Sequence, residues 1–460
     1  MWSQTRQLRQ LRQLGLLTIE PAVCSHTTAA CSTPMQLTHQ WEPHSATTSL
    51  QNWQLGQLPW ACPYLRTKKT GLHCADMQRL QGTSLPSHRT FSVLRPQPGS
   101  RQFALELKCP PVTALAGTRP KVDIDWDTLG FGLQNVAANM YVANWTEEAG
   151  WQQGDLQAYG PLPMLPSAQV LNYGQAAFEG MKAQRSHKDR IVVFRPDRNA
   201  ERLHQGAERL IMPPVPKDMF IDAVTATVRA NVDYVPPLGK GSMYLRPLLM
   251  GTGPILGLGP APSYTFAIYC AAVGAYFKSG QLTPIDLIVE ERFHRAAPGG
   301  MGGTKAAGNY SPVLVTQLAA KKAGYSDVVY LDAKTDTYLE EVSSCNIFCV
   351  KGNTIKTPPL QGTILPGVTR RSILELAAHR GYQVEEVPVS VHEAMEADEL
   401  FTTGTAVVVC SVGSLTYQGR RREFTQQGQP GKVALEMYTS LTDIQAEKAD
   451  DPFGWVVPMA

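Results

Sequence analysis

The sequence changes in character near residue 121, and this change limits which residues can form a folded core. Residues 1–100 contain nine Lys and Arg but only three Asp and Glu, and their apolar residues show no sustained periodicity. Beyond residue 121, short runs of β-branched residues alternate with segments whose apolar residues recur every three or four positions. This second pattern is typical of strands and helices that bury one face. We therefore predict that the folded protein begins near Lys121, after a head formed by residues 1–120.

The start of the basic head is similar to a targeting signal. Its arginines and leucines can form a short cationic amphipathic helix: Arg6, Leu8, Arg9, Leu11, Arg12 and Leu14. The Ser, Thr, Gln and His residues that follow, with very few acids, are typical of an organelle transit peptide. A disordered cytosolic tail is the alternative. Composition alone does not separate plastid from mitochondrion.

Charge, cysteine content and hydropathy exclude several classes of protein. The net charge of +3 is too small to indicate a nucleic-acid-binding surface. The nine cysteines include no CxxC pair and no Cys/His ligand spacing, so we expect reduced thiols and no metal site. The longest apolar run, residues 266–277, is too short to cross a bilayer and is interrupted by Gly274. We therefore expect neither a nucleic-acid partner nor a membrane partner.

The body has the pattern of two α+β domains. Strands are predicted at residues 190–194, 264–277, 285–289, 327–331, 346–350 and 399–415. Helices are predicted at residues 199–211, 221–232, 311–324 and 368–381. Helices and strands alternate without a strict βαβ rhythm, which favours an α+β fold. We predict a small domain over residues 121–277, a linker over 278–284 and a large domain over 285–460.

A lysine in a glycine-rich loop is the first candidate for chemistry. Residues 299–310 read GGMGGTKAAGNY. A phosphate-binding P-loop requires Gly-Lys followed by Ser or Thr, whereas here Thr304 precedes Lys305 and Ala306 follows it. Glycines allow the backbone to lie close to a flat ligand, and a desolvated lysine amine forms Schiff bases. Taken alone, an ordinary loop lysine is the more common explanation.

Three further segments carry polar groups that a binding site would need. Glu340 and Glu341 precede an apolar strand, and one of them would pair with a ring nitrogen if it faced inward. Pro366 and Gly367 open a helix, whose first unpaired N–H groups bind phosphate well. Thr405 adds a hydroxyl at the end of a strand. Each feature is common by itself, so only the combination indicates a site.

Taken together and in order, these segments resemble the branched-chain amino acid aminotransferases, and most closely their plant plastid-type members. That family belongs to the fold-type IV (class IV) pyridoxal phosphate enzymes. The resemblance covers residues 121–455 and has no counterpart in the basic head. The matching segments are residues 125–132 (DWDTLGFG), 171–182 (LNYGQAAFEGMK), 244–253 (YLRPLLMGTG), 299–310, 340–348 (EEVSSCNIF), 362–371 (GTILPGVTRR) and 403–406 (TGTA).

The resemblance implies the two-domain, D-amino acid aminotransferase-like α+β fold, with residues 285–460 as the cofactor-binding domain. It implies that Lys305 holds pyridoxal phosphate as a Schiff base and, once released, moves a proton at the substrate Cα. Glu341 would pair with the ring nitrogen, and Glu340 is expected to be exposed. The other implied cofactor contacts are Tyr310 at the ring hydroxyl, Leu365 against the ring, and Arg202, Thr405 and the backbone N–H groups of Val368 and Thr369 at the phosphate.

The resemblance also implies a homodimer that transfers the amino group of L-leucine, L-isoleucine or L-valine to 2-oxoglutarate in a ping-pong reaction. The products are branched 2-oxo acids and L-glutamate, and the plastid is favoured over the mitochondrion. The implied substrate contacts are Phe178, Tyr244, Tyr310, Ser344 and Ala406 in the apolar pocket, Tyr173, Leu256 and Leu258 from a partner subunit, and Arg246 with the Tyr173 hydroxyl at the glutamate carboxylate.

The chain departs from the family pattern at two places. The sequence also leaves two alternative functions open. Some relatives have CxxC where this chain has Val407 and Cys410, so we expect no thiol–disulfide switch. Residues 134–140 also depart from the pattern, which leaves the pocket opening undefined. A D-amino acid aminotransferase or an aminodeoxychorismate lyase is the alternative enzyme of the same fold type. An inactive cofactor-binding scaffold is the alternative from another class, and the intact Lys305 and Glu341 argue against it.

Overall fold

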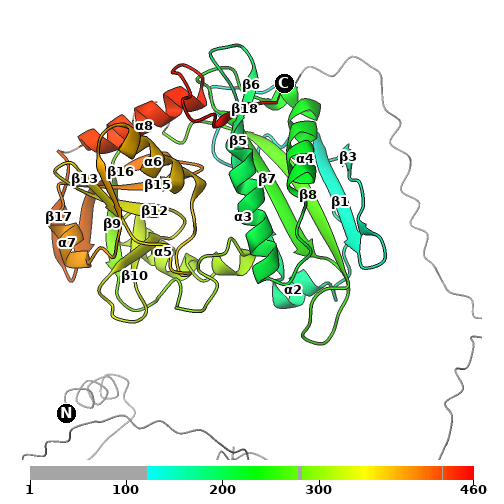
Figure 1. Ribbon diagram of the computed structural model, residues 1–460, viewed down its shortest axis with the longest axis horizontal. Coiled ribbons are helices and arrows are strands. Elements are labelled where there is room, and N and C mark those ends of the chain that lie inside the picture. The colour runs from blue at the N-terminus through cyan, green and yellow to red at the C-terminus, as the bar shows by residue number, and fades with distance from the viewer. Residues whose placement is uncertain (1–121, 278–281, 427, 460) are drawn as a thin grey trace, which may run out of the picture. The chain divides into compact units, whose positions relative to one another are not determined.

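The computed structural model describes residues 122–277, 282–426 and 428–459, whose strands form two nine-stranded sheets (Figure 1). The predicted head, residues 1–120, and residues 278–281 of the predicted linker lie outside the described residues. No described helix is long and apolar enough to cross a membrane. Within the described ranges, no group of three or more His, Cys, Asp or Glu side chains could hold a metal ion.

The first sheet is antiparallel. Its strands are β1 (Asn139–Thr146), β2 (Gly150–Trp151), β3 (Asp155–Ala158), β4 (Ala176–Phe178), β5 (Met181–Arg185), β6 (Ile191–Phe194), β7 (Ser242–Gly251), β8 (Ser263–Val273) and β18 (Val456–Pro458). The order is β18-β6-β5-β7-β8-β1-β2, with β3 on β1 and β4 on β7. The helices of this part are α2 (Gln169–Tyr173), α3 (Pro196–Arg209), α4 (Lys217–Ala230) and the 3-10 turn η1 (Val232–Tyr234).

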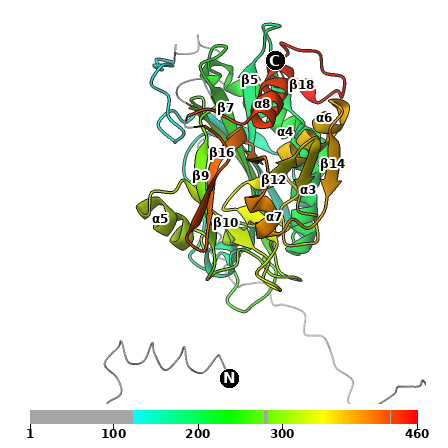
Figure 2. The ribbon, with the colours of Figure 1, turned by 90° about the vertical axis from the view of Figure 1, so that its left-hand side faces the viewer.

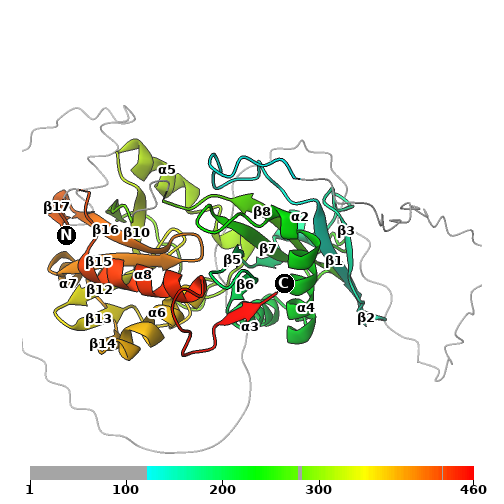
Figure 3. The same ribbon diagram turned by 90° about the horizontal axis from the view of Figure 1, so that it is seen from above.

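Helices α3 and α4 cover this sheet because each has one apolar face (Figures 1 and 3). Leu203 of α3 and Phe220 and Val224 of α4 are buried in one cluster with Phe266 of β8. Complete burial of such a side chain stabilises the fold by about 1.5–3 kcal/mol. Pro196 begins α3, where a missing backbone N–H costs nothing. Because the apolar face of α3 packs on the sheet, only the side chains on its other faces remain available for other contacts.

The second sheet is mixed and partly closed. Its strands are β9 (Ile285–Glu290), β10 (Asp327–Leu331), β11 (Leu339–Val342), β12 (Asn346–Lys351), β13 (Thr354–Thr357), β14 (Gln383–Glu386), β15 (Glu399–Gly404), β16 (Val408–Tyr417) and β17 (Arg420–Glu423). The order is β11-β10-β9-β16-β15-β12-β13-β14, with β17 on β16. An additional pairing of β11 with β12 closes the first six strands of this order into a barrel, seen from another side in Figure 2.

Helices α6 (Val368–His379) and α8 (Lys432–Gln445) pack on the second sheet (Figure 3). Ile373 and Leu376 of α6 and Met437 and Leu441 of α8 are buried in one cluster with Phe401 of β15. The remaining elements of this part connect the strands. These elements are the 3-10 turn η2 (Ala307–Asn309), α5 (Leu314–Lys322) and α7 (Val391–Met395).

Strand β18 follows the second sheet in sequence but belongs to the first sheet. Val457 pairs with Val193 of β6, and the Met459 N–H donates to the Ile191 carbonyl at 2.8 Å. Met459 itself is buried in the core of the first sheet. The chain therefore returns to the first sheet after it has completed the second.

The predicted elements are found with shifted ends, and the α+β class is confirmed. Strand β10 has the predicted bounds, whereas the predicted strand 399–415 is divided by a turn at residues 405–407. The helix predicted at 311–324 begins later, at Leu314, because Ser311 forms a turn in which its carbonyl accepts from the Leu314 N–H at 3.2 Å. The domain boundaries at residues 277 and 285 stay a prediction.

Candidate active site

The glycine-rich loop that carries Lys305 is held between two other segments. The Lys305 carbonyl accepts from the Phe178 N–H at 3.1 Å, which ties the loop to β4. On the other side, a Cβ atom at Gly302 would lie 2.2 Å from the Thr363 carbonyl oxygen. Gly303 donates its N–H to the Gly362 carbonyl at 2.8 Å. Gly302 and Gly303 thus allow close backbone packing, and this packing fixes the position of Lys305.

The Lys305 amine lies beside two aromatic rings, those of Phe178 and Tyr310. Its Nζ donates to the Tyr310 hydroxyl at 2.9 Å and lies 4.4 Å from the centre of the Phe178 ring. Burial, followed by the positive charge of Arg202, lowers the pKa of Lys305 to about 7. A considerable fraction of the amine is therefore unprotonated at neutral pH, as a nucleophile or a general base requires. Burial also raises the pKa of Tyr310 to about 12, so its hydroxyl keeps its proton.

Glu341 is a buried carboxyl group on β11, with 3% of its surface exposed. Its Oε1 accepts a short hydrogen bond from the Leu365 N–H and a longer one, 3.4 Å, from the Asn346 amide. The Arg295 guanidinium lies 3.6 Å away. Burial raises the pKa of Glu341 to about 7, although Arg295 opposes this effect. A cationic ligand beside Glu341 would therefore stabilise its ionised carboxylate.

Glu340 is buried as well, with 5% of its surface exposed, so the prediction that it is exposed was wrong. All four residues of β11 are buried, because β11 pairs with β10 and β12 inside the barrel. Alternation along a strand therefore turns Glu340 and Glu341 to opposite sides, neither of which faces water. Burial raises the pKa of Glu340, and a hydrogen bond from Thr363 opposes this effect.

Arg202 lies on α3 in a buried ion pair with Glu179. Its Nε and Nη2 donate to the two Glu179 carboxylate oxygens, each at 2.7 Å, and its Nη1 donates to the Pro366 carbonyl at 3.1 Å. Asn199, one turn earlier on α3, donates to the same carboxylate at 2.7 Å. Glu179 is fully buried. The guanidinium is therefore fixed beside the residues that precede α6.

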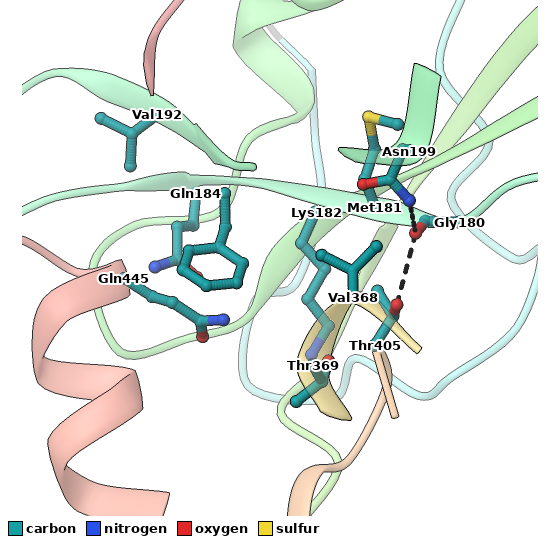
Figure 4. Close-up of a pocket in the computed structure, with 11 residues that line it drawn as sticks. Gly180, Met181, Lys182, Gln184, Val192, Asn199, Val368, Thr369, Thr405 and Gln445 are labelled. Carbon is teal, nitrogen blue, oxygen red and sulfur yellow. Dashed lines mark hydrogen bonds between the residues drawn. The ribbon is translucent and has the colours of Figure 1, made fainter. Parts of the chain in front are cut away.

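The predicted phosphate-binding groups converge from separate elements. Val368 and Thr369 form the first turn of α6, as predicted from Pro366 and Gly367. Thr405 follows β15 and donates through its hydroxyl to the Gly180 carbonyl at 3.3 Å. Val368, Thr369 and Thr405 line one cavity (Figure 4). Arg202 is joined to this group through Pro366, two residues before Val368.

The predicted substrate residues Phe178, Tyr244 and Arg246 lie together. The Arg246 guanidinium stacks at 4.9 Å from the Phe178 ring and at 5.4 Å from the Tyr244 ring, and its buried Nε has no hydrogen-bond partner among the described residues. Phe178 also contacts the Tyr310 ring edge-on at 4.8 Å. A Cβ atom at Gly180 would lie 2.1 Å from the Tyr244 hydroxyl, so a larger residue there would require the Tyr244 side chain to move. The Arg246 guanidinium and the Lys305 amine thus both lie against the Phe178 ring.

Four other predicted residues lie at exposed positions. The Tyr173 hydroxyl donates to the Leu256 carbonyl at 2.6 Å, and Tyr173 is 44% exposed. Leu256 and Leu258 are 91% and 87% exposed, which is exceptional for leucine. Ser344 is exposed in the turn between β11 and β12. Within the described residues of this single chain, Tyr173, Leu256 and Leu258 therefore make no hydrogen bond or ring contact with Lys305.

Comparison with known proteins shows to which family the chain belongs. The model of the family described as amino-transferase class IV matches residues 176–415. Branched-chain-amino-acid aminotransferase 3, chloroplastic, of Arabidopsis thaliana is 54% identical over 339 residues, which are 74% of this chain and 81% of that relative. The chain belongs to the branched-chain amino acid aminotransferases.

Two further comparisons agree with this membership. Branched-chain amino acid aminotransferase 1, mitochondrial, of Humulus lupulus is 47% identical over 379 residues, covering 82% of this chain and 95% of the relative. The crystal structure of the Escherichia coli branched-chain amino acid aminotransferase is 28% identical and aligns with a TM-score of 0.61 over 70% of this chain and 100% of that chain. The resemblance stated from the sequence and the fold-type IV fold are therefore confirmed.

Sequence reasoning about this aminotransferase did not find every polar residue of the site. Glu179, Asn199, Lys182 and Arg295 were given no role, although Glu179 and Lys182 lie in a segment that matches the family. Their signal in the sequence is weak, because a charged residue next to an apolar strand is usually exposed. Their burial depends on elements far away in the chain.

Proposed function

We propose that this aminotransferase uses pyridoxal 5′-phosphate to transfer the amino group of L-leucine, L-isoleucine or L-valine to 2-oxoglutarate. The products are branched 2-oxo acids and L-glutamate, formed in two alternating half-reactions. The observation that carries the proposal is the half-buried Lys305 amine between Phe178 and Tyr310, whose pKa burial lowers to about 7. Membership of the family supports the substrate class.

The residues around Lys305 fit each polar part of the cofactor. The Glu341 carboxyl suits the pyridine nitrogen, the Tyr310 hydroxyl suits the ring hydroxyl, and Leu365 suits the ring face. The phosphate would be held by Arg202, Thr405 and the N–H groups of Val368 and Thr369 at the start of α6. When bound, pyridoxal phosphate supplies a carbonyl carbon that accepts the amino group and a ring that takes up negative charge.

The proton transfers are assigned to Lys305. Its Nζ, unprotonated in a considerable fraction of molecules at neutral pH, removes the proton from the substrate Cα and returns a proton later in the half-reaction. Tyr310 holds Nζ at 2.9 Å, and Phe178 limits the access of water to it. Glu341 would keep the ring nitrogen of the bound cofactor protonated, because a cationic neighbour stabilises its buried carboxylate.

The substrate pocket must accept an apolar side chain and a carboxylate in turn. Phe178, Tyr244, Tyr310, Ser344 and Ala406 are assigned to the apolar part. Arg246 is assigned to the second carboxylate of glutamate and 2-oxoglutarate, because its buried Nε has no partner among the described residues and its charge already stacks on two rings. Binding of that carboxylate would satisfy the unpaired N–H.

A homodimer would complete this pocket. Tyr173, Leu256 and Leu258 are exposed, as residues that reach into a partner's site would be in a single chain. Helix α5 also exposes Leu314, Val315 and Leu318 to the extent of 52%, 57% and 57%. Exposed apolar groups of this kind favour an interface between subunits. Sedimentation of the purified protein measures the oligomeric state, and a stable monomer with full activity would refute the shared site.

We further propose an organellar location, in the plastid rather than the mitochondrion. The basic head supports an organelle. The higher identity to the chloroplastic relative, 54% against 47% for the mitochondrial one, supports the plastid. A fluorescent protein fused to residues 1–120 tests both statements in plant cells, since a cytosolic signal would contradict the first and a mitochondrial signal the second.

A panel of amino donors tests the reaction. With 2-oxoglutarate as acceptor, L-leucine, L-isoleucine and L-valine should be converted at least about tenfold better in kcat/KM than D-alanine. Activity on D-alanine or aminodeoxychorismate, without activity on the branched amino acids, would favour the alternative enzymes of the fold type. Lys305→Ala should abolish turnover and the cofactor absorbance that depends on the lysine, and an unchanged spectrum would refute this role of Lys305.

A further inference from the structure

Arg195 joins the first sheet to helix α6. It lies between β6 and α3, and only 4% of it is exposed. Its Nη1 donates to the Ser372 hydroxyl at 2.9 Å and to the Glu375 carboxylate at 3.0 Å, and its Nη2 donates to the same carboxylate at 3.3 Å. The backbone of Arg195 has a φ of 46°, which residues with a side chain rarely adopt. Such a backbone persists only where the surrounding contacts impose it.

The C-terminal segment covers this guanidinium. The Arg195 N–H donates to the Trp455 carbonyl at 2.8 Å, and the guanidinium lies 4.8 Å from the centre of the Trp455 ring. Phe194 and Phe453 pack against the same ring. These rings limit the access of water to the guanidinium, which strengthens its attraction to Glu375. The arginine is therefore held rigidly between the two sheets.

The contact with Ser372 continues to the first turn of α6. Ser372 is fully buried, and its hydroxyl donates to the Val368 carbonyl at 2.8 Å. Val368 begins α6, and its N–H is one of the groups proposed to hold the cofactor phosphate. Two consecutive hydrogen bonds thus connect Arg195 to the phosphate-binding turn.

Helix α3 carries the other phosphate-binding group, Arg202. It lies about two helical turns after Arg195, and its Nη1 donates to the Pro366 carbonyl at 3.1 Å. Helices α3 and α6 are therefore joined at two places, at Pro366 beside the phosphate-binding groups and at Ser372 about one turn into α6. Two separate joints fix the angle between the helices, whereas the joint at Pro366 alone would leave α6 free to rotate.

We infer that Arg195 is a positioning residue for the cofactor phosphate, which fixes α6 against α3 so that the first N–H groups of α6 and the Arg202 guanidinium meet on one phosphate group. The inference rests on the proposed function, because that function supplies the phosphate. It adds that a residue outside the phosphate site sets the affinity of that site.

The test replaces Arg195 with methionine, which keeps much of the side-chain length but has no hydrogen-bond donor. Glu375 keeps a second partner, Arg371, at 2.9 Å, so the substitution leaves no carboxylate without a counter-charge. Ser372→Ala is the second variant. It removes the link to Val368 and keeps the ion pair of Arg195 with Glu375, so it tests the inference even if Arg195→Met does not fold.

The probes are pyridoxamine 5′-phosphate and pyridoxamine, which lacks the phosphate. Neither forms a Schiff base with Lys305, because each has an amine in place of the aldehyde. Both are titrated into the full chain stripped of cofactor, with tryptophan fluorescence as the signal.

A hydrogen bond made by a charged group changes an equilibrium constant about tenfold or more. We therefore expect Arg195→Met to weaken binding of pyridoxamine 5′-phosphate about tenfold and to leave that of pyridoxamine unchanged. A bond between neutral groups contributes less, so Ser372→Ala should weaken binding of the phosphorylated probe about threefold, again without an effect on pyridoxamine. Arg380→Met, at an exposed position at the opposite end of α6, is the matched control and should change neither affinity.

The outcomes are distinguishable. Equal weakening of both probes, or a lower melting temperature with unchanged affinity for both, would assign Arg195 to the fold alone and overturn the inference. If the wild-type protein prefers the phosphorylated probe and both variants keep that preference in full, the inference fails and the proposed function stands. If the wild-type protein itself shows no preference for the phosphorylated probe, the proposed function fails and the inference fails with it.

Discussion

Replacing Glu341 with glutamine removes a carboxyl group that the cofactor-free fold keeps uncharged over an unusual pH range. Burial raises its pKa from the ordinary value of 4.5 to about 7. Between these two pH values the folded state binds more protons than the unfolded state, so the free energy of unfolding falls as the pH rises. Each pKa unit corresponds to about 1.4 kcal/mol, and the whole change corresponds to about 3 kcal/mol.

The assay is urea denaturation of the cofactor-free protein at about pH 4.5 and about pH 7.5, at one protein concentration. Relative to Glu341→Gln, the wild-type protein should lose about 3 kcal/mol of unfolding free energy between the lower and the higher pH. Glu148→Gln, at an exposed carboxylate, is the control and should follow the wild-type protein at both pH values. A difference between wild type and Glu341→Gln that is the same at both pH values would refute the reasoning. Bound cofactor should reduce the loss of unfolding free energy of the wild-type protein between the two pH values, because its cationic nitrogen favours the ionised carboxylate.

Three other substitutions test neighbouring contacts. Glu179→Ala leaves the Arg202 guanidinium buried without its partner, so the free energy of unfolding in urea should fall by about 3–5 kcal/mol, and unchanged stability would contradict the ion pair. Gly180→Ala adds a Cβ atom 2.1 Å from the Tyr244 hydroxyl, which should cost about 1–3 kcal/mol of stability and weaken the apparent affinity for L-leucine in steady-state assays. An affinity equal to that of wild type would show that the tyrosine moves freely. Arg246→Gln should weaken the apparent affinity for the acceptor 2-oxoglutarate about tenfold or more and that for L-leucine much less, and equal changes would argue against the carboxylate assignment.

The sequence was informative about secondary structure wherever the apolar pattern was strong. The run at residues 327–331 is a strand with the predicted bounds, because its β-branched residues are buried on both faces. The ends of other elements were less predictable. Helix α5 begins at Leu314, although Ser311 and Pro312 have the pattern of a helix start, since the turn at Ser311 is equally compatible with these residues.

Prediction of the site was limited by contacts between distant segments. The glycine-rich loop indicated Lys305, but the closeness of Phe178 to its amine arises from the packing of β4 on that loop. The burial of Glu340 depends on closure of the barrel, which local sequence does not reveal. Likewise, Lys182 and Ala406 are 224 residues apart, so their contact has no local signal.

The pairing of β18 with β6 has a consequence for synthesis on the ribosome. The first sheet acquires its outermost strand only after every strand of the second sheet has been translated. Until then the free edge of β6 is open to pairing with other nascent chains. Translation that stops before Val456 should therefore yield a product that aggregates, even though it contains every residue assigned to the cofactor.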